Sequence, residues 1–200
     1  EAPQEQAEAL VVDVGAESLL DVSRVSDWVS GRGPCPFDVG SLNAEQKATV
    51  LDCGGAVARK EHMLMMLTGG PGTGKSYTCK MVEAAVIKCG FKVVGVAFMW
   101  SAVSQMTVGT RTSIHSFLKG GIGSFTAASL NDEEKMRRLC NDAKLQHVRE
   151  AISEGDLLVV DEVSCVDVAL FVGLDVVLRA AFKSSEAFGG ISVLLLGDFK

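Results

Sequence analysis

A glycine-rich octapeptide, Gly69-Gly-Pro-Gly-Thr-Gly-Lys-Ser76, matches the phosphate-loop pattern GxxxxGK[ST] at every position. Glycines let successive backbone N–H groups turn towards a phosphate without Cβ clashes, and the N-terminus of a following helix favours negative charge. Lys75 would neutralise the β- and γ-phosphates of ATP, and the Ser76 hydroxyl would ligate Mg²⁺. The residues expected to surround the phosphates are Gly70, Pro71, Gly72, Thr73, Gly74, Lys75 and Ser76.

A second candidate for chemistry is the acidic pair Asp161-Glu162, which ends the apolar run Leu157–Val160. A carboxylate at the carboxyl end of a buried parallel strand points into the crevice where open α/β sheets bind ligands. Asp161 would hold Mg²⁺ through water, and Glu162 would polarise the attacking water. Strands often end in acidic residues, so the pair is weak evidence alone. Together with the glycine-rich loop it predicts ATP hydrolysis, with Lys75 and Glu162 as the catalytic residues.

The elements that must position these residues alternate between helices and strands that are apolar throughout. Such a pattern is typical of a parallel sheet covered on both faces, which predicts an α/β fold of the P-loop NTPase type. Residues 100–130 are expected to be less regular. The predicted helices run from an Asn43 cap to about Lys60, from Ser76 to Lys88, from a capping box of Asn131 and Glu134 to Ile152, and from Val166 to Phe182; the predicted strands are Met63–Leu67, Phe91–Met99, Leu157–Val160 and Ile191–Leu196.

Charge divides the chain into two parts. The net charge is −6, and residues 1–30 alone hold seven acids against Arg24, so residues 31–200 balance at 18 basic and 18 acidic side chains. We therefore expect an acidic leader or linker over residues 1–40 and a single domain over 41–200. This balance offers no basic footprint for nucleic acid and excludes none.

Other classes of protein fit the composition poorly. A hydrophobic content of 48% excludes a disordered chain, and no apolar run reaches the roughly 18 residues of a membrane helix. The six cysteines are scattered without a CxxC pair, which favours reduced thiols in an intracellular protein over disulfides or zinc. We expect a protein without a membrane partner, monomeric, and located in the nucleus or a mitochondrion if eukaryotic, otherwise in the cytoplasm. The chain starts with Glu1 and stops at Lys200 after an apolar run, so we also expect a fragment of a longer protein.

Several blocks resemble, in their order, the superfamily 1 DNA helicases of the Pif-one/RecD type. The resemblance covers about residues 41–200 and implies the first of two RecA-like domains, cut before the second. It implies ATP-driven 5′→3′ movement on single-stranded DNA and unwinding of duplex or forked DNA, in DNA repair, recombination or telomere maintenance. The blocks are Leu42-Asn-Ala-Glu-Gln46, Gly69–Ser76, Thr112-Ser-Ile-His-Ser-Phe117, Val160–Asp167, and Phe188-Gly-Gly-Ile191 leading to Gly197-Asp-Phe199.

The resemblance also implies roles for residues outside the two nucleotide motifs. Gln46 resembles the glutamine that reads the adenine edge, although Asn43 and Gln46 also fit a capping box and both readings stand. Asp198 resembles the aspartate that couples the γ-phosphate site to DNA. Ser101, Thr112 and His115 resemble positions near the DNA strand, and His115 fits a core histidine equally well.

One segment departs from the family pattern. Residues 97–105 lack the Ala-Pro-Thr-Gly-like turn that touches the DNA backbone, and Trp100 there either packs inside or stacks on a base.

Two alternatives to a helicase remain: a P-loop ATPase that serves as a loader or repair accessory factor, and a nucleotide-binding module without turnover.

Overall fold

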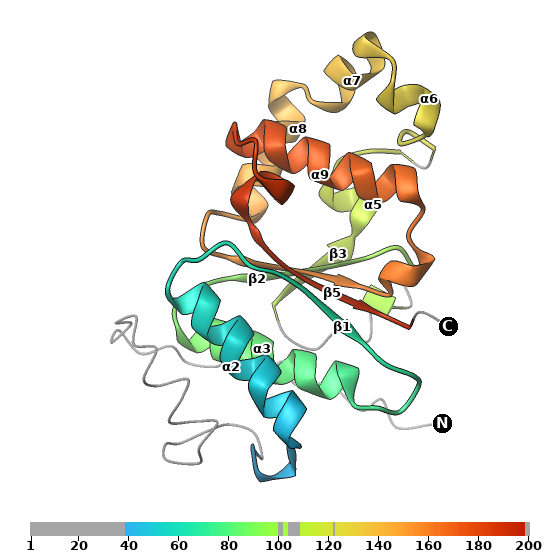
Figure 1. Ribbon diagram of the computed structural model, residues 1–200. Coiled ribbons are helices and arrows are strands. Elements are labelled where there is room, and N and C mark those ends of the chain that lie inside the picture. The colour runs from blue at the N-terminus through green and yellow to red at the C-terminus, as the bar shows by residue number, and fades with distance from the viewer. Residues whose placement is uncertain (1–38, 100–101, 104–108, 122, 199–200) are drawn as a thin grey trace, which may run out of the picture.

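The computed structural model describes residues 39–99, 102–103, 109–121 and 123–198, and its centre is a sheet of five parallel strands (Figure 1). The strand order is β1-β5-β4-β2-β3, and every neighbouring pair is parallel. This confirms the predicted α/β fold. The strands are β1 (Leu64–Thr68), β2 (Val93–Ala97), β3 (Thr110–Ser113), β4 (Leu157–Asp161) and β5 (Ser192–Gly197).

Helices lie on both faces of this sheet (Figure 1). Helices α2 and α3 cover one face, and α5, α8 and α9 cover the other. The longer helices begin and end close to the predicted residues, with Asn43 as the cap of α2. The helices are α2 (Ala44–Ala58), α3 (Lys75–Lys88), α5 (Ile114–Phe117), α6 (Ala127–Leu130), α7 (Glu133–Leu139), α8 (Asp142–Ala151) and α9 (Val168–Phe182).

Two apolar cores result from the period-two alternation of strand side chains. In β4, Leu157 and Val159 pack in the core under α2 and α3, whereas Leu158 and Val160 pack under α9. All four side chains are fully buried. A strand that is apolar at every position is therefore required at the centre of the sheet.

Strand β5 separates the strand before the glycine-rich loop from the strand that ends in Asp161. The registers pair Thr68 with Gly197 and Val160 with Leu195, so β1, β5 and β4 end at the same edge. The loops that follow these strands are thereby brought together at one edge of the sheet.

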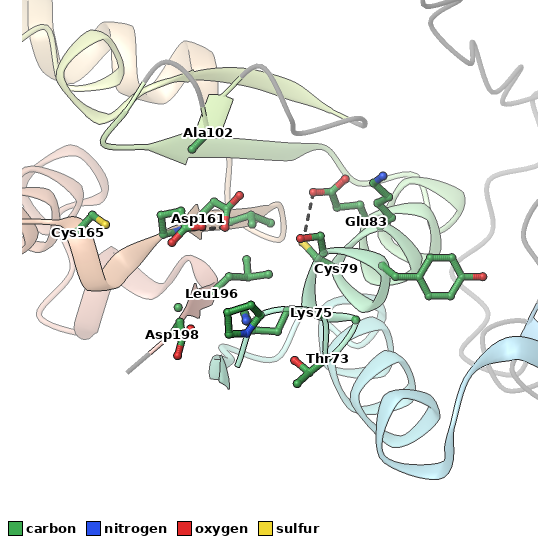
Figure 2. A pocket seen from close by; sticks show the side chains of 18 of the residues that line it. Thr73, Lys75, Cys79, Glu83, Ala102, Asp161, Cys165, Leu196 and Asp198 are labelled. Carbon is green, nitrogen blue, oxygen red and sulfur yellow. Dashed lines mark hydrogen bonds between the residues drawn. The ribbon is translucent and has the colours of Figure 1, made fainter. Parts of the chain in front are cut away.

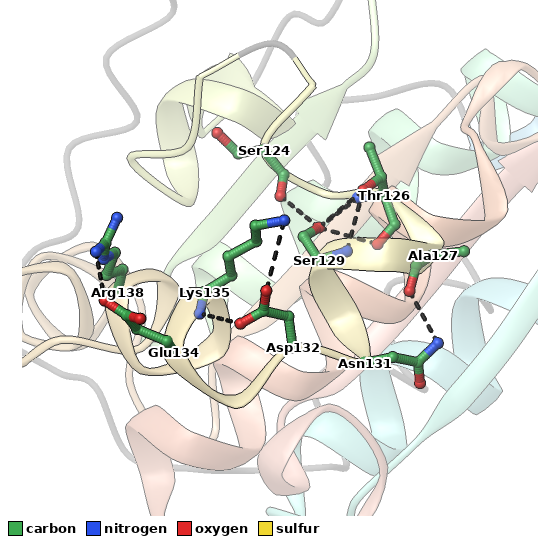
Figure 3. A network of polar contacts seen from close by, with 9 residues as sticks. All are labelled: Ser124, Thr126, Ala127, Ser129, Asn131, Asp132, Glu134, Lys135 and Arg138. Carbon is green, nitrogen blue, oxygen red and sulfur yellow. Dashed lines mark hydrogen bonds and ion pairs between the residues drawn. The ribbon is translucent and has the colours of Figure 1, made fainter.

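The predicted helix from Asn131 to Ile152 is wrong in two respects. It is two helices, α7 and α8, and the cap of α7 is Asp132, whose carboxylate accepts from the Lys135 N–H at 3.0 Å. Asn131 instead donates from Nδ2 to the Ala127 carbonyl and closes α6 (Figure 3). The break before α8 comes from Asn141, whose side chain accepts from the Lys144 N–H at 3.0 Å and caps a new helix.

Strand β3 was not predicted, because its sequence Thr-Arg-Thr-Ser lacks the apolar character of the other strands. It lies at the edge of the sheet and pairs with β2 only, so its side chains remain partly exposed. The proposed leader, residues 1–40, falls almost wholly outside the described residues and stays a prediction. Within the described part of the chain, no helix is long and apolar enough to cross a membrane.

Candidate nucleotide-binding site

The glycine-rich loop connects the carboxyl end of β1 to the first turn of α3. Gly72 and Gly74 have φ of +77° and +85°, in the left-handed region that glycine adopts without strain. Gly74 is also the N-cap of α3, and a Cβ there would lie 2.6 Å from Gln46 Nε2. Thr73 Oγ1 donates to the Gly70 carbonyl at 2.9 Å and tightens the loop. The backbone conformation thus favours glycine at position 74, and a larger residue there would also displace the Gln46 amide.

The side chain of Lys75 folds back over the start of this loop. Its ammonium donates to the carbonyl oxygens of Gly69 and Gly70, the latter at 3.0 Å, and it is the first residue of α3. An ammonium held over the helix N-terminus places positive charge where the loop N–H groups also gather. A bound phosphate would take the place of the loop carbonyls as the partner of Lys75.

Asp161 and Ser76 supply hard oxygen atoms at one end of the site. Burial raises the pKa of the Asp161 carboxyl, and the Glu162 N–H, which donates to its Oδ1 at 2.9 Å, opposes that rise. A divalent cation would favour the ionised carboxylate further. A hydroxyl and a carboxylate are ligands that suit Mg²⁺, so the residues present fit the metal that the sequence motifs imply.

Glu162 has an unusual backbone conformation for a residue other than glycine. Its φ and ψ are 52° and 43°, in the left-handed region, which costs about 1–2 kcal/mol for an L-residue. The turn into the 3-10 helix η2 (Val163–Cys165) follows directly. Such strain clusters at functional sites, because the surrounding structure must hold it in place. The Glu162 side chain is exposed, so it is open to water.

These residues share one pocket of about 760 Å³ (Figure 2). The loop lies on one side, with Asp161 and Asp198 from the ends of β4 and β5 opposite. Gly70 and Gln46 are not part of its lining. The sequence-predicted residues that line it are Pro71, Gly72, Thr73, Gly74, Lys75, Ser76, Asp161, Glu162 and Asp198.

Gln46 forms the capping box that the sequence left as one of its two readings. Its Oε1 accepts from the Asn43 N–H at 3.0 Å, and Asn43 Oδ1 accepts from the Gln46 N–H at 2.9 Å. Its Nε2 lies 3.5 Å from the Thr73 carbonyl, so the same amide also touches the phosphate loop. Recognition of adenine by Gln46 stays a prediction.

Thr112 and His115, two of the residues predicted to lie near DNA, are not part of this pocket. Thr112 is in β3 opposite Val96, and His115 is in α5 with its ring 5.8 Å from that of Phe98. His115 is partly exposed and lines a second pocket of about 920 Å³, whereas its neighbours Ile114 and Phe117 are buried. Ser101 and Trp100 lie outside the described residues, so the predictions made for them stay as they are.

Sequence reasoning missed the part of the pocket that α3 forms beyond Ser76. Cys79, Lys80 and Glu83 line it at helical spacing from Ser76, a pattern that was available in the sequence. Glu83 is only 3% exposed, and burial raises its pKa to about 7. The remaining unforeseen contributors to the lining are Tyr77, Met99, Ala102, Val159, Cys165, Leu196 and Gly197.

Comparison with known proteins agrees with this architecture. The chain is 32% identical over 156 residues to the ATP-dependent DNA helicase PIF1 of Homo sapiens, covering 78% of this chain and 21% of that protein. The crystal structure of the Pif1 helicase from Candida albicans matches with a TM-score of 0.57 and 26% identity, over 79% of this chain and 32% of that one. That of Bacteroides Pif1 matches with a TM-score of 0.55 and 24% identity, over 78% and 32% of the two chains.

The chain thus spans about a fifth of the length of the curated relatives it matches. The family model described as PIF1-like helicase matches residues 41–200, which include every nucleotide-site residue described above. The chain belongs to the PIF1-like helicase family.

Proposed function

We propose that this chain contains the first RecA-like, ATP-binding domain of an ATP-dependent DNA helicase that couples hydrolysis of Mg²⁺–ATP to movement along single-stranded DNA. The observation that carries the proposal is that Lys75, Ser76, Asp161 and Glu162 line one pocket at the carboxyl edge of the sheet. Phosphate neutralisation, metal ligation and activation of water each have a side chain of the right chemistry there.

In the proposed reaction the loop N–H groups and Lys75 hold the β- and γ-phosphates. Ser76 and Asp161 hold Mg²⁺, which neutralises charge that develops on the phosphates. Glu162 accepts a proton from the attacking water. Asp198, at the end of β5 between the two motif strands, links the γ-phosphate position to the DNA side of the domain. A second RecA-like domain supplies the arginines that complete the site.

The proposed DNA partner is a single strand or a forked duplex, approached from the side of Thr112 and His115. Support comes from the relatives: one solved structure is of Bacteroides Pif1 bound to single-stranded DNA, and another concerns unwinding at forked duplex DNA by two coordinating Pif1 helicases. For this chain, 5′→3′ movement and a monomeric motor are the proposed polarity and state. Its proposed setting is DNA repair, recombination or telomere maintenance inside the cell, in the nucleus or a mitochondrion if the organism is eukaryotic and otherwise in the cytoplasm.

The test is duplex unwinding and ATP hydrolysis by a natural protein that contains this chain at the length of its relatives. We expect hydrolysis to rise at least tenfold with single-stranded DNA, and a duplex with a 5′ tail to open where one with a 3′ tail does not. Stimulated hydrolysis without strand separation would instead indicate a loader or accessory ATPase. Nucleotide binding without hydrolysis would indicate a module without turnover.

A further inference from the structure

Glu83 is a buried acid in the nucleotide pocket to which no motif gives a role. It lies on α3 seven residues after Ser76, which is two helical turns along the same face. Figure 2 shows Glu83 and Cys79 on the α3 side of the pocket, across from Asp161, with Ala102 above Asp161. Glu83 therefore lines the same pocket as Ser76 and Asp161, two turns further along α3 than Ser76.

The hydrogen bonds of this carboxyl are incomplete. Oε1 accepts from the Cys79 thiol at 3.4 Å, but Oε2 is buried and has no partner. Across the part of the chain that the structure describes, Oε2 is the one buried side-chain oxygen or nitrogen in that condition. Leaving such an oxygen unpaired costs free energy of folding, which an apolar residue of similar size would avoid.

Asp156 is a buried carboxylate with a purely structural role, and it differs from Glu83 in its hydrogen bonds. It is 5% exposed, and both of its oxygens are filled: Oδ1 accepts from the Lys92 N–H at 2.9 Å and Oδ2 from the Ser153 N–H at 2.8 Å. Glu83 makes no comparable contribution to a loop or cap. Its burial without a second partner points to a ligand in the pocket.

The surroundings of Glu83 indicate which ligand. Three charged groups act on its carboxyl besides burial: Asp161 on β4 raises its pKa, and Lys80 on α3 and Arg111 on β3 lower it. No three His, Cys, Asp or Glu side chains of the described residues converge to chelate a bare metal ion. Mg²⁺ keeps several waters when it binds to proteins. An acid in the same pocket can therefore accept a hydrogen bond from one of those waters without ligating the ion itself.

We propose that Glu83 is a positioning residue of the nucleotide site, whose Oε2 accepts a hydrogen bond from a water in the shell of the divalent cation held by Ser76 and Asp161. The inference rests on the proposed function, because it takes the pocket to hold Mg²⁺–ATP. Oε2 reaches the pocket by rotation about the terminal torsion of the side chain, which is soft. Glu83 would thereby help to order the water shell of that cation.

The experiment measures binding of a fluorescent ATP analogue to the 200-residue chain, in Mg²⁺ and in EDTA, for wild type, Glu83→Leu and Glu83→Gln. In Glu83→Leu the ratio of the two affinities falls about tenfold, the value of one hydrogen bond to a charged shell. The melting temperature of this variant stays the same or rises, since an unpaired buried oxygen is gone. Glu83→Gln keeps an acceptor oxygen and retains at least a third of the wild-type ratio.

Asp156→Asn is the matched control, a neutralised carboxylate in a buried place outside the pocket. It lowers the melting temperature and leaves the Mg²⁺-to-EDTA ratio within twofold of wild type. The proposal is overturned if Glu83→Leu keeps the wild-type ratio, if its melting temperature falls as that of Asp156→Asn does, or if Glu83→Gln loses as much as Glu83→Leu. Wild-type chain that binds no nucleotide in Mg²⁺ contradicts the proposed function itself, a result distinct from any of these.

Discussion

The backbone N–H of Glu162 donates to Oδ1 of Asp161 at 2.9 Å, so the residue proposed to activate water also fixes the carboxylate proposed to hold the metal. The left-handed backbone at Glu162 makes this turn possible directly at the end of β4. The adjacent side chains of Asp161 and Glu162 can thereby take different roles, the first at the metal and the second at the attacking water. Because the shared contact uses the Glu162 backbone, a change in its side chain leaves the position of Asp161 intact.

Glu162→Gln should therefore separate binding from hydrolysis. The variant keeps the N–H that holds Asp161 but loses the base, and we expect Mg²⁺–ATP affinity within threefold of wild type with hydrolysis lower by about 10²–10⁴-fold. The measurement is single-turnover phosphate release beside equilibrium nucleotide binding, in the protein at the length of its relatives. Loss of binding in this variant would mean that Glu162 has a structural role only.

Lys75→Ala should remove hydrolysis, because the β- and γ-phosphates lose their counter-ion. The lysine also ties the carbonyls of Gly69 and Gly70 together, so nucleotide affinity should fall with it. Steady-state ATP hydrolysis with single-stranded DNA present checks this. Lys88→Ala, at the far end of the same helix and outside the pocket, is the matched control and should keep wild-type rates. Turnover of Lys75→Ala within threefold of wild type would exclude the loop as the phosphate site.

Gly173→Ala should destabilise the fold without altering the nucleotide site. A Cβ on Gly173 would lie 2.2 Å from Phe125 Cδ1, so the ring that anchors the segment before α6 against α9 must shift. Such overpacking costs about 1–3 kcal/mol. Denaturant unfolding should show that loss, and Gly121→Ala should not, since among the described residues its Cβ would meet just Ser124 Oγ, at 3.4 Å. Equal stability of the two variants would contradict the packing of Phe125.

Glu83 should make stability depend on pH. Its pKa is raised from an ordinary value of 4.5 to about 7 in the folded chain, mainly by burial. The unfolded chain therefore releases this proton first, so the contribution of Glu83 is fully present below pH 4.5 and is lost progressively up to about pH 7, by at most about 3 kcal/mol. The melting temperature of Glu83→Leu relative to wild type should thus rise between pH 5 and 8. A difference independent of pH would mean that Glu83 is not buried as described.

Much of the fold could be predicted because it depends on short-range patterns. Three short patterns predicted local structure that is present: the glycines of the loop, the apolar run before Asp161 and the Asn43 cap. The break at Asn141 escaped prediction because apolar residues continue at helical spacing across it. There the side-chain cap prevails over the hydrophobic pattern.

The candidate site also has a part that the sequence predicts and a part that it does not. Sequence places Lys75 and Asp161 in motifs, but it cannot tell that β5 comes between their strands and carries Asp198 to the same edge. Glu83 has no motif at all, since an acid seven residues after Ser76 is normally a solvated position on a helix. Only the packing of α3 on the sheet shows that this acid is buried beside the pocket.

We propose that residues 41–200 form the first of two motor domains. The most direct measurement is phosphate release from ATP, with and without single-stranded DNA, by residues 1–200 alone and by the protein at the length of its relatives. We predict DNA-stimulated turnover in the longer protein and, for residues 1–200, turnover lower by about 10³–10⁵-fold, the usual contribution of arginines from a second domain. Robust DNA-stimulated hydrolysis by the 200 residues alone would exclude a two-domain motor and indicate a self-sufficient or oligomeric ATPase.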